Sequence, residues 1–224
     1  MRKMPIYLVF SRTGTWLSRS IGFVTKTHYT HVSISLDSSF KTMYSFGRLD
    51  PDNPFSGGLT TENIYTGVFQ KSPNARCLIY KLEITEKQFL DLEREIKSFF
   101  DSDINYRYNF IGLFGVLMDK PIHRDNHYFC SQFITTLLKQ SNIWHSPKIP
   151  ELTSPTDLLN IPNKTLIYEG FINELDFSIE TQVALIWQIW IVLMCDNNII
   201  IFILHILVLF FSLKINSYFI FFIY

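Results

Sequence analysis

The sequence predicts an α+β fold, in which a small antiparallel sheet packs against helices. Strict alternation of apolar and polar residues from His31 to Leu36 is typical of a strand with one buried face. Apolar residues at helical spacing after Thr85 indicate an amphipathic helix. With 224 residues, 47% of them hydrophobic, the chain can bury the core of one ordinary domain.

The strands are predicted from short apolar or alternating runs bounded by turn residues. Ile6–Phe10 is too short for the apolar region of a signal peptide, so we expect a first strand and no export signal. His31–Leu36 is the second strand, and "TMYSF" (residues 42–46) follows the turn "DSS" as the third. Turn chemistry predicts a loop at Asp50–Gly58, and Arg76–Ile84 is the next strand.

The helices are predicted from caps and from apolar spacing. Thr85 with Gln88 forms a capping-box pattern ahead of a stripe that ends at Phe100. A helix is also predicted at Thr15–Lys26, and the mostly apolar "YNFIGLFGVLMDK" (residues 108–120) is interpreted as a helix buried on several sides. Ser154 followed by Pro155 marks the start of a short helix.

One cysteine stands where a helix is predicted to begin. The apolar stripe of this helix consists of Cys130, Phe133, Ile134, Leu137 and Leu138. A helix N-terminus favours the thiolate form of cysteine, because its free N–H groups and dipole attract negative charge. Cys130 is therefore either a buried small apolar residue or a nucleophile, whereas Cys77 and Cys195 have only the structural interpretation.

A nucleophilic thiol needs a base, and His31 is the candidate. It opens the strand "HVSISL" on the polar face, which also carries Ser33 and Ser35. A histidine on such a face could accept the thiol proton if the face is turned toward the helix start. The alternative is a structural histidine at a strand end.

The order of these motifs resembles a known family. "THYTHVSISLD", followed at a distance by "YFCSQFITTLL", is similar to the circularly permuted branch of the NlpC-type papain-like cysteine hydrolases, which are related to lecithin:retinol acyltransferase-like enzymes. The resemblance covers roughly Pro5 to Gly170. It implies a permuted papain-like fold with Cys130 as nucleophile and His31 as general base. The implied activity is hydrolysis or acyl transfer on an amide, peptide or lipid ester, without metal or cofactor.

The family usually has a third polar residue that orients the imidazole, on the strand after the histidine. The resemblance places it in "TMYSF", where Ser45 is the first choice and Tyr44 the second. Neither is the His, Asn, Gln or Glu that is often found there. The register of the strand decides between them, because neighbouring strand residues face opposite ways.

Two other functions are compatible with the sequence. A mixed zinc site could be formed by histidines and the cysteine, namely His28, His31, His123, His127 and Cys130. Alternatively, the domain is a catalytically silent papain-like module that binds a ligand in the same cleft. Metal analysis and thiol alkylation distinguish these functions from a thiol enzyme.

The last part of the chain differs in composition, which predicts a domain at residues 1–177 and a hydrophobic tail at 178–224. The tail carries charge only at Glu180, Asp196 and Lys214. Its two apolar runs each fall short of the roughly 20 residues that span a bilayer. We therefore interpret residues 183–224 either as a membrane hairpin that turns at Asp196–Asn198, on the cytoplasmic face, or as an extension without structural purpose.

The charge and the cysteine content exclude some classes. The formal net charge is zero, so no electrostatic argument favours nucleic acid as a partner. Three scattered cysteines cannot form a disulfide framework, which favours a reducing compartment.

Overall fold

The computed structural model describes residues 2–13, 28–50, 52–53, 56–72 and 74–175. Their strands form one eight-stranded sheet with the order β7-β6-β4-β3-β2-β1-β5-β8, antiparallel except for the pair β6 and β7. The strands are β1 (Lys3–Arg12), β2 (His31–Ser35), β3 (Met43–Arg48), β4 (Gly57–Glu62), β5 (Arg76–Thr85), β6 (Arg107–Tyr108), β7 (His127–Tyr128) and β8 (Lys164–Phe171). The predicted α+β class is confirmed, although the sheet is larger than the small one expected.

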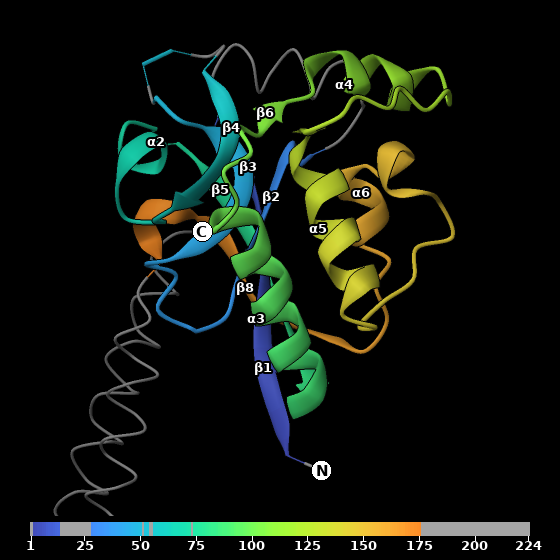
Figure 1. Ribbon diagram of the computed structural model, residues 1–224. Coiled ribbons are helices and arrows are strands. Elements are labelled where there is room, and N and C mark those ends of the chain that lie inside the picture. The colour runs from blue at the N-terminus through green and yellow to red at the C-terminus, as the bar shows by residue number, and fades with distance from the viewer. Residues whose placement is uncertain (1, 14–27, 51, 54–55, 73, 176–224) are drawn as a thin grey trace, which may run out of the picture. The chain divides into compact units, whose positions relative to one another are not determined.

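The helices of the described residues are few and mostly short. They are α2 (Gly67–Gln70), α3 (Glu86–Phe100), α4 (Phe110–Leu117), α5 (Cys130–Gln140) and α6 (Pro155–Leu158), with 3₁₀ turns at Pro150–Leu152 and Ile172–Glu174. The longest two, α3 and α5, lie beside each other against the sheet (Figure 1).

The main core lies between these two helices and one face of the sheet. Strand β1 contributes Ile6, Leu8 and Phe10, whose alternation places all three on this face. The predicted stripe of α5 is confirmed, because each of its five apolar residues is buried. The core thus fixes the axis of α5 and with it the place of its first turn.

The predicted capping box of α3 is confirmed. The Thr85 side chain accepts from the backbone N–H of Gln88, and the Gln88 side chain accepts from the backbone N–H of Thr85. Two N–H groups that a helix start leaves unpaired are thereby satisfied.

Helix α4 is present as predicted, but it is not buried on several sides. Ile111, Phe114 and Met118 are 52%, 62% and 65% exposed. Gly112 and Gly115 are its buried residues, so the helix packs through its glycines and leaves the large side chains outside. Apolar composition predicted the helix correctly and its burial incorrectly.

Two of the longer strands lack a sequence signal. Strand β4 begins with Gly57 inside the predicted loop and reads "GGLTTE", with one large apolar residue. Strand β8 pairs with β5 at the sheet edge, where most of its residues are partly or fully exposed. Neither strand therefore shows the alternation on which strand prediction depends.

Some predictions fall on residues outside the described part, namely the helix at 15–26 and the tail at 178–224. Contacts define a compact unit of Met1–Leu175, and the predicted domain boundary at 177 lies just beyond it. In the part of the chain that the structure describes, no helix has both the length and the apolar character to cross a membrane.

The cap of α3 can be tested by Thr85→Ala. We expect the free energy of unfolding to fall by about 1 kcal/mol, because the Gln88 backbone N–H loses the hydroxyl that accepts from it. Ser98→Ala is the control, since it removes a hydroxyl that bonds only the Glu95 carbonyl within the same helix. Urea denaturation of both variants measures the difference, and equal stability would show that the cap contributes nothing.

Candidate active site

The thiol of Cys130 is buried at the first residue of α5. Strand β7 leads directly into this helix through Phe129, whose extended backbone forms the N-cap. Cys130 is 2% exposed and belongs to the main core cluster. Cys130 is thus both buried in the core and located at a helix start, so its location alone does not distinguish a structural cysteine from a nucleophile. Its contacts do.

The imidazole of His31 is held by a carboxylate that the sequence did not indicate. Its Nε2 lies 2.9 Å and 3.0 Å from the two carboxylate oxygens of Glu62, at the last residue of β4. The Ser33 hydroxyl donates to Oε2 of the same carboxylate. The side chains of His31 and Glu62 are only 20% and 15% exposed. This shielding strengthens the pair relative to one in water.

The other contact of the imidazole is the Cys130 thiol, to which it is hydrogen-bonded. The structure thus brings together two residues 99 positions apart in the sequence. A carboxylate, an imidazole and a thiol in series form the arrangement that activates a nucleophile through a base.

The partners of the thiol lower its pKa. Burial alone would raise it, but the hydrogen bond and the positive charge of His31 outweigh that effect. The backbone N–H groups of Val32 and Ser131 also donate to the sulfur. By contrast, burial raises the pKa of Cys77 to about 12. Of these two cysteines, only Cys130 lies where a thiolate is stabilised.

The pKa of His31 shifts the opposite way, well above its ordinary value. Burial alone would lower it, but the charge of Glu62 and the hydrogen bonds to Cys130 and Glu62 prevail. The pKa of Glu62 is lowered, because the charge and hydrogen bond of His31 and the hydroxyl of Ser33 outweigh its burial. All three shifts favour a thiolate, an imidazolium and a carboxylate.

Ser45 does not occupy the orienting position predicted for it. Its buried hydroxyl donates to the Val32 carbonyl at 2.8 Å. The register between β2 and β3 covers only Ile34 with Tyr44 and Ser35 with Met43. Beyond these pairs, the Ser45 hydroxyl donates to the Val32 carbonyl, and the Val32 N–H is hydrogen-bonded to the thiol. Ser45 therefore joins the strands where they separate around the helix start.

Tyr44, the second choice, faces the core side of the sheet. Its ring meets that of Phe100 at 5.5 Å between centroids, with the planes at 70°. The orienting residue is instead one strand further on, at Glu62. A Glu belongs to the residue types expected for that role, but β4 had not been recognised as a strand.

Glycine at position 47 gives the Glu62 carboxylate its space. A Cβ atom on Gly47 would collide with Oε1 of Glu62 and lie 3.4 Å from its Cδ. Gly57 does the same for Tyr108, since a Cβ there would lie 2.7 Å from the Tyr108 Cβ. Gly47 of β3 and Gly57 of β4 thus each leave space for a side chain of the site.

Tyr108 is a further site residue that sequence reasoning did not single out. Its hydroxyl is hydrogen-bonded to the Cys130 sulfur and to the Cys130 backbone N–H. Burial and the Cys130 charge raise its pKa, so it stays a neutral donor. The parallel pairing of β6 with β7 sets Tyr108 beside Tyr128, two residues before the cysteine.

The remaining histidines of the zinc hypothesis have other partners. His127 Nδ1 lies 2.6 Å from the Asp125 carbonyl, and His123 lies within 3.5 Å of the carboxylates of Asp125 and Glu151. His28 is exposed. Across the described ranges, no three His, Cys, Asp or Glu side chains are grouped as a metal site requires.

No family model matches the chain, and no curated protein matches it. Among solved structures, the chain is similar to the metalloprotein yiiX from Escherichia coli O157:H7, with a TM-score of 0.49 and 14% sequence identity. The match covers 76% of this chain and 98% of the other.

The role of Glu62 can be tested by the pH dependence of thiol alkylation in Glu62→Gln. Loss of the carboxylate lowers the pKa of His31 and raises that of Cys130, so the thiolate persists over a narrower range. At about pH 6, below the ordinary thiol pKa of about 8.5, we expect wild-type Cys130 to react with iodoacetamide roughly tenfold faster than the variant, the change for one pKa unit. Superimposable pH profiles would contradict the assignment.

The space at Gly47 can be tested by Gly47→Ala in a double-mutant cycle with Glu62→Gln. The added methyl group displaces the carboxylate, so we expect the alkylation rate of the single variant to fall toward that of Glu62→Gln. The double variant should then lose little more, because both changes remove one contact. Additive losses would show that Gly47 acts elsewhere.

Proposed function

We propose that the protein is a cysteine-dependent hydrolase or acyltransferase that acts on an amide, a peptide or a lipid ester. The observation that carries the proposal is the imidazole of His31, which contacts the Cys130 thiol on one side and the Glu62 carboxylate on the other. A structural cysteine needs no such base. Surrounding three ionisable groups with protein is costly for stability, so chemistry is the better reason for this arrangement.

The proposed reaction proceeds through a thioester. The Cys130 thiolate attacks the substrate carbonyl carbon, and collapse of the tetrahedral intermediate breaks the bond to the amine or alcohol. The His31 imidazolium gives its proton to that leaving group. Neutral His31 then takes a proton from water, or from an alcohol or amine acceptor, whose oxygen or nitrogen attacks the thioester carbon. The bond between that carbon and the sulfur breaks, the acyl group leaves on the acceptor, and the thiolate–imidazolium pair is restored. Glu62 keeps the ring oriented throughout and stabilises its charged form.

The tetrahedral intermediate carries an oxyanion, for which two donors lie beside the sulfur. They are the Cys130 backbone N–H and the Tyr108 hydroxyl, which are hydrogen-bonded to each other. A substrate carbonyl at this position would take both donors, at the positive end of α5. Tyr108 thus adds a side-chain donor to the backbone group expected from the sequence.

The same features support a permuted papain-like fold of the NlpC type. The histidine opens a central strand, the cysteine begins a helix packed on that sheet, and the histidine precedes the cysteine in the chain. Anchoring through residues 183–224 on the cytoplasmic face is part of this proposal and rests on composition alone.

An activity-based probe for nucleophilic thiols tests the function on the full chain. We expect stoichiometric labelling of the wild type at Cys130, none of Cys130→Ala, and at least a tenfold slower reaction of His31→Ala. Cys77→Ser is the matched control, because that thiol has a raised pKa and no base and should not contribute.

Two results would contradict the proposal. Labelling at an unchanged rate in His31→Ala would show that no base is paired with the thiol. A wild-type Cys130 that reacts no faster than a free model thiol would instead favour a silent binding module. Circular dichroism of each variant excludes misfolding as the cause.

A further inference from the structure

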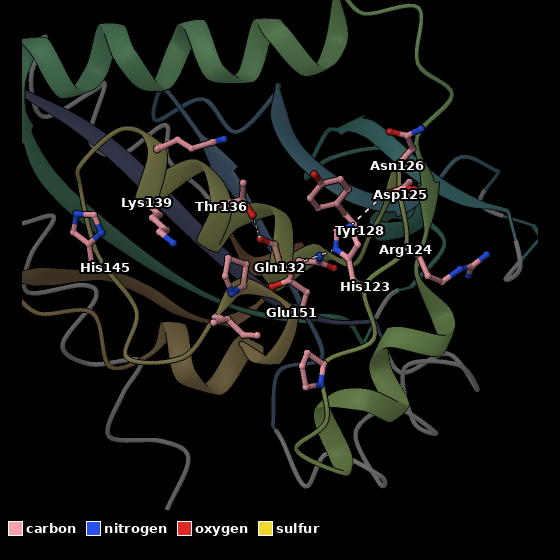
Figure 2. Close-up of a pocket in the computed structure, with 14 residues that line it drawn as sticks. His123, Arg124, Asp125, Asn126, Tyr128, Gln132, Thr136, Lys139, His145 and Glu151 are labelled. Atoms are coloured by element: carbon pink, nitrogen blue, oxygen red, sulfur yellow. Dashed lines mark hydrogen bonds and ion pairs between the residues drawn. The ribbon is translucent and has the colours of Figure 1, made fainter.

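A cavity of about 960 Å³ adjoins the start of α5, where Tyr128 and Gln132 are among the residues that line it. Neither Cys130 nor His31 lines it. Its walls come from the segment before β7, from the exposed side of α5 and from the turn at Pro150–Leu152 (Figure 2). The volume is within the range of small-molecule sites.

The wall of this cavity contains a polar side chain without a partner. Gln132 is 3% exposed, and no described group donates to its Oε1 atom. A buried amide oxygen without a donor is costly, so such groups are nearly always paired in native proteins. Leucine would fill the same position on α5 without that cost. The retained amide therefore indicates a ligand that supplies an N–H or O–H donor.

The neighbours of Gln132 in the cavity indicate the charge of that ligand. Glu151 is 23% exposed, and its ion pair is a 3.5 Å contact with His123, which is itself 71% exposed. Figure 2 draws Glu151 and Gln132 among the residues that line the cavity, together with Tyr128 from β7. The cations Lys139 and Arg124 also line the cavity; Lys139 is exposed, whereas Arg124 is partly buried. Gln132 and Glu151 thus supply two acceptor groups to the cavity wall.

We propose that this cavity binds a small molecule with a primary ammonium group, which donates to the amide oxygen of Gln132 and to the carboxylate of Glu151. An ammonium has three donors and no acceptor, so it can satisfy both oxygens at once. Lys139 is exposed at the rim, so solvent and salt screen its charge from the ammonium. This site does not depend on the chemistry at Cys130.

Three probes with the same carbon skeleton test the proposal: propylammonium, propionamide and propionate. They are titrated into the ¹⁵N-labelled full chain while the Gln132 side-chain amide is followed by NMR. We expect propylammonium to bind most tightly, propionamide more weakly and propionate not at all. Glu151→Gln should weaken propylammonium roughly tenfold, the loss of a charge-assisted bond, and leave propionamide unchanged. Lys139→Gln, at the rim, is the matched control and should not weaken either probe.

Gln132→Leu gives an independent measurement that does not require a ligand. Removal of the unpartnered amide should raise the melting temperature while it abolishes binding of both donors. Cys130→Ala should bind propylammonium as the wild type does, which separates this site from the proposed catalysis. Preference for propionate, or no binding of propylammonium at millimolar concentration, would overturn the proposal. So would a lower melting temperature of Gln132→Leu together with unchanged binding.

Discussion

The contact of Glu62 with His31 is the interaction on which the site depends. Without the carboxylate, burial would keep the imidazole neutral, and a neutral imidazole would not stabilise a thiolate beside it. The carboxylate is itself maintained by Ser33 and by the space at Gly47. Glu62, His31 and Cys130 therefore form one unit, in which the charge of each group offsets the free-energy cost of burying the charge of its neighbour.

The sheet contributes a local separation of two strands. Strands β2 and β3 pair at Ile34 and Ser35, and the Val32 carbonyl then accepts from Ser45 in place of a ladder partner. The freed Val32 N–H donates to the sulfur. A buried backbone donor must find a partner, and here that partner is the thiolate. The same separation therefore satisfies the backbone and stabilises the nucleophile.

Sequence reasoning could place Cys130 and His31, because each belongs to an element with a strong pattern. Helix α5 and strand β2 each bury one face, so apolar residues recur in their sequences at the helical or the strand period. The third residue could not be found in this way. Glu62 ends a strand that begins with two glycines, which remove the apolar alternation of that strand. A Cβ atom on the first of them, Gly57, would collide with Tyr108 of the site. Tyr108 is likewise positioned by a two-residue strand, too short for any period.

The charges at the thiol also limit which substrates suit the proposed reaction. With thiolate, imidazolium and carboxylate all formed, the unit carries one net negative charge. A carboxylate next to the scissile bond would be repelled by the sulfur and by Glu62 at short range, where screening is weak. A neutral acyl group meets no such repulsion, and its carbonyl oxygen can take the donors at Tyr108 and the helix start. The electrostatics therefore favour uncharged amides and esters as acyl donors, whatever the leaving group carries further away.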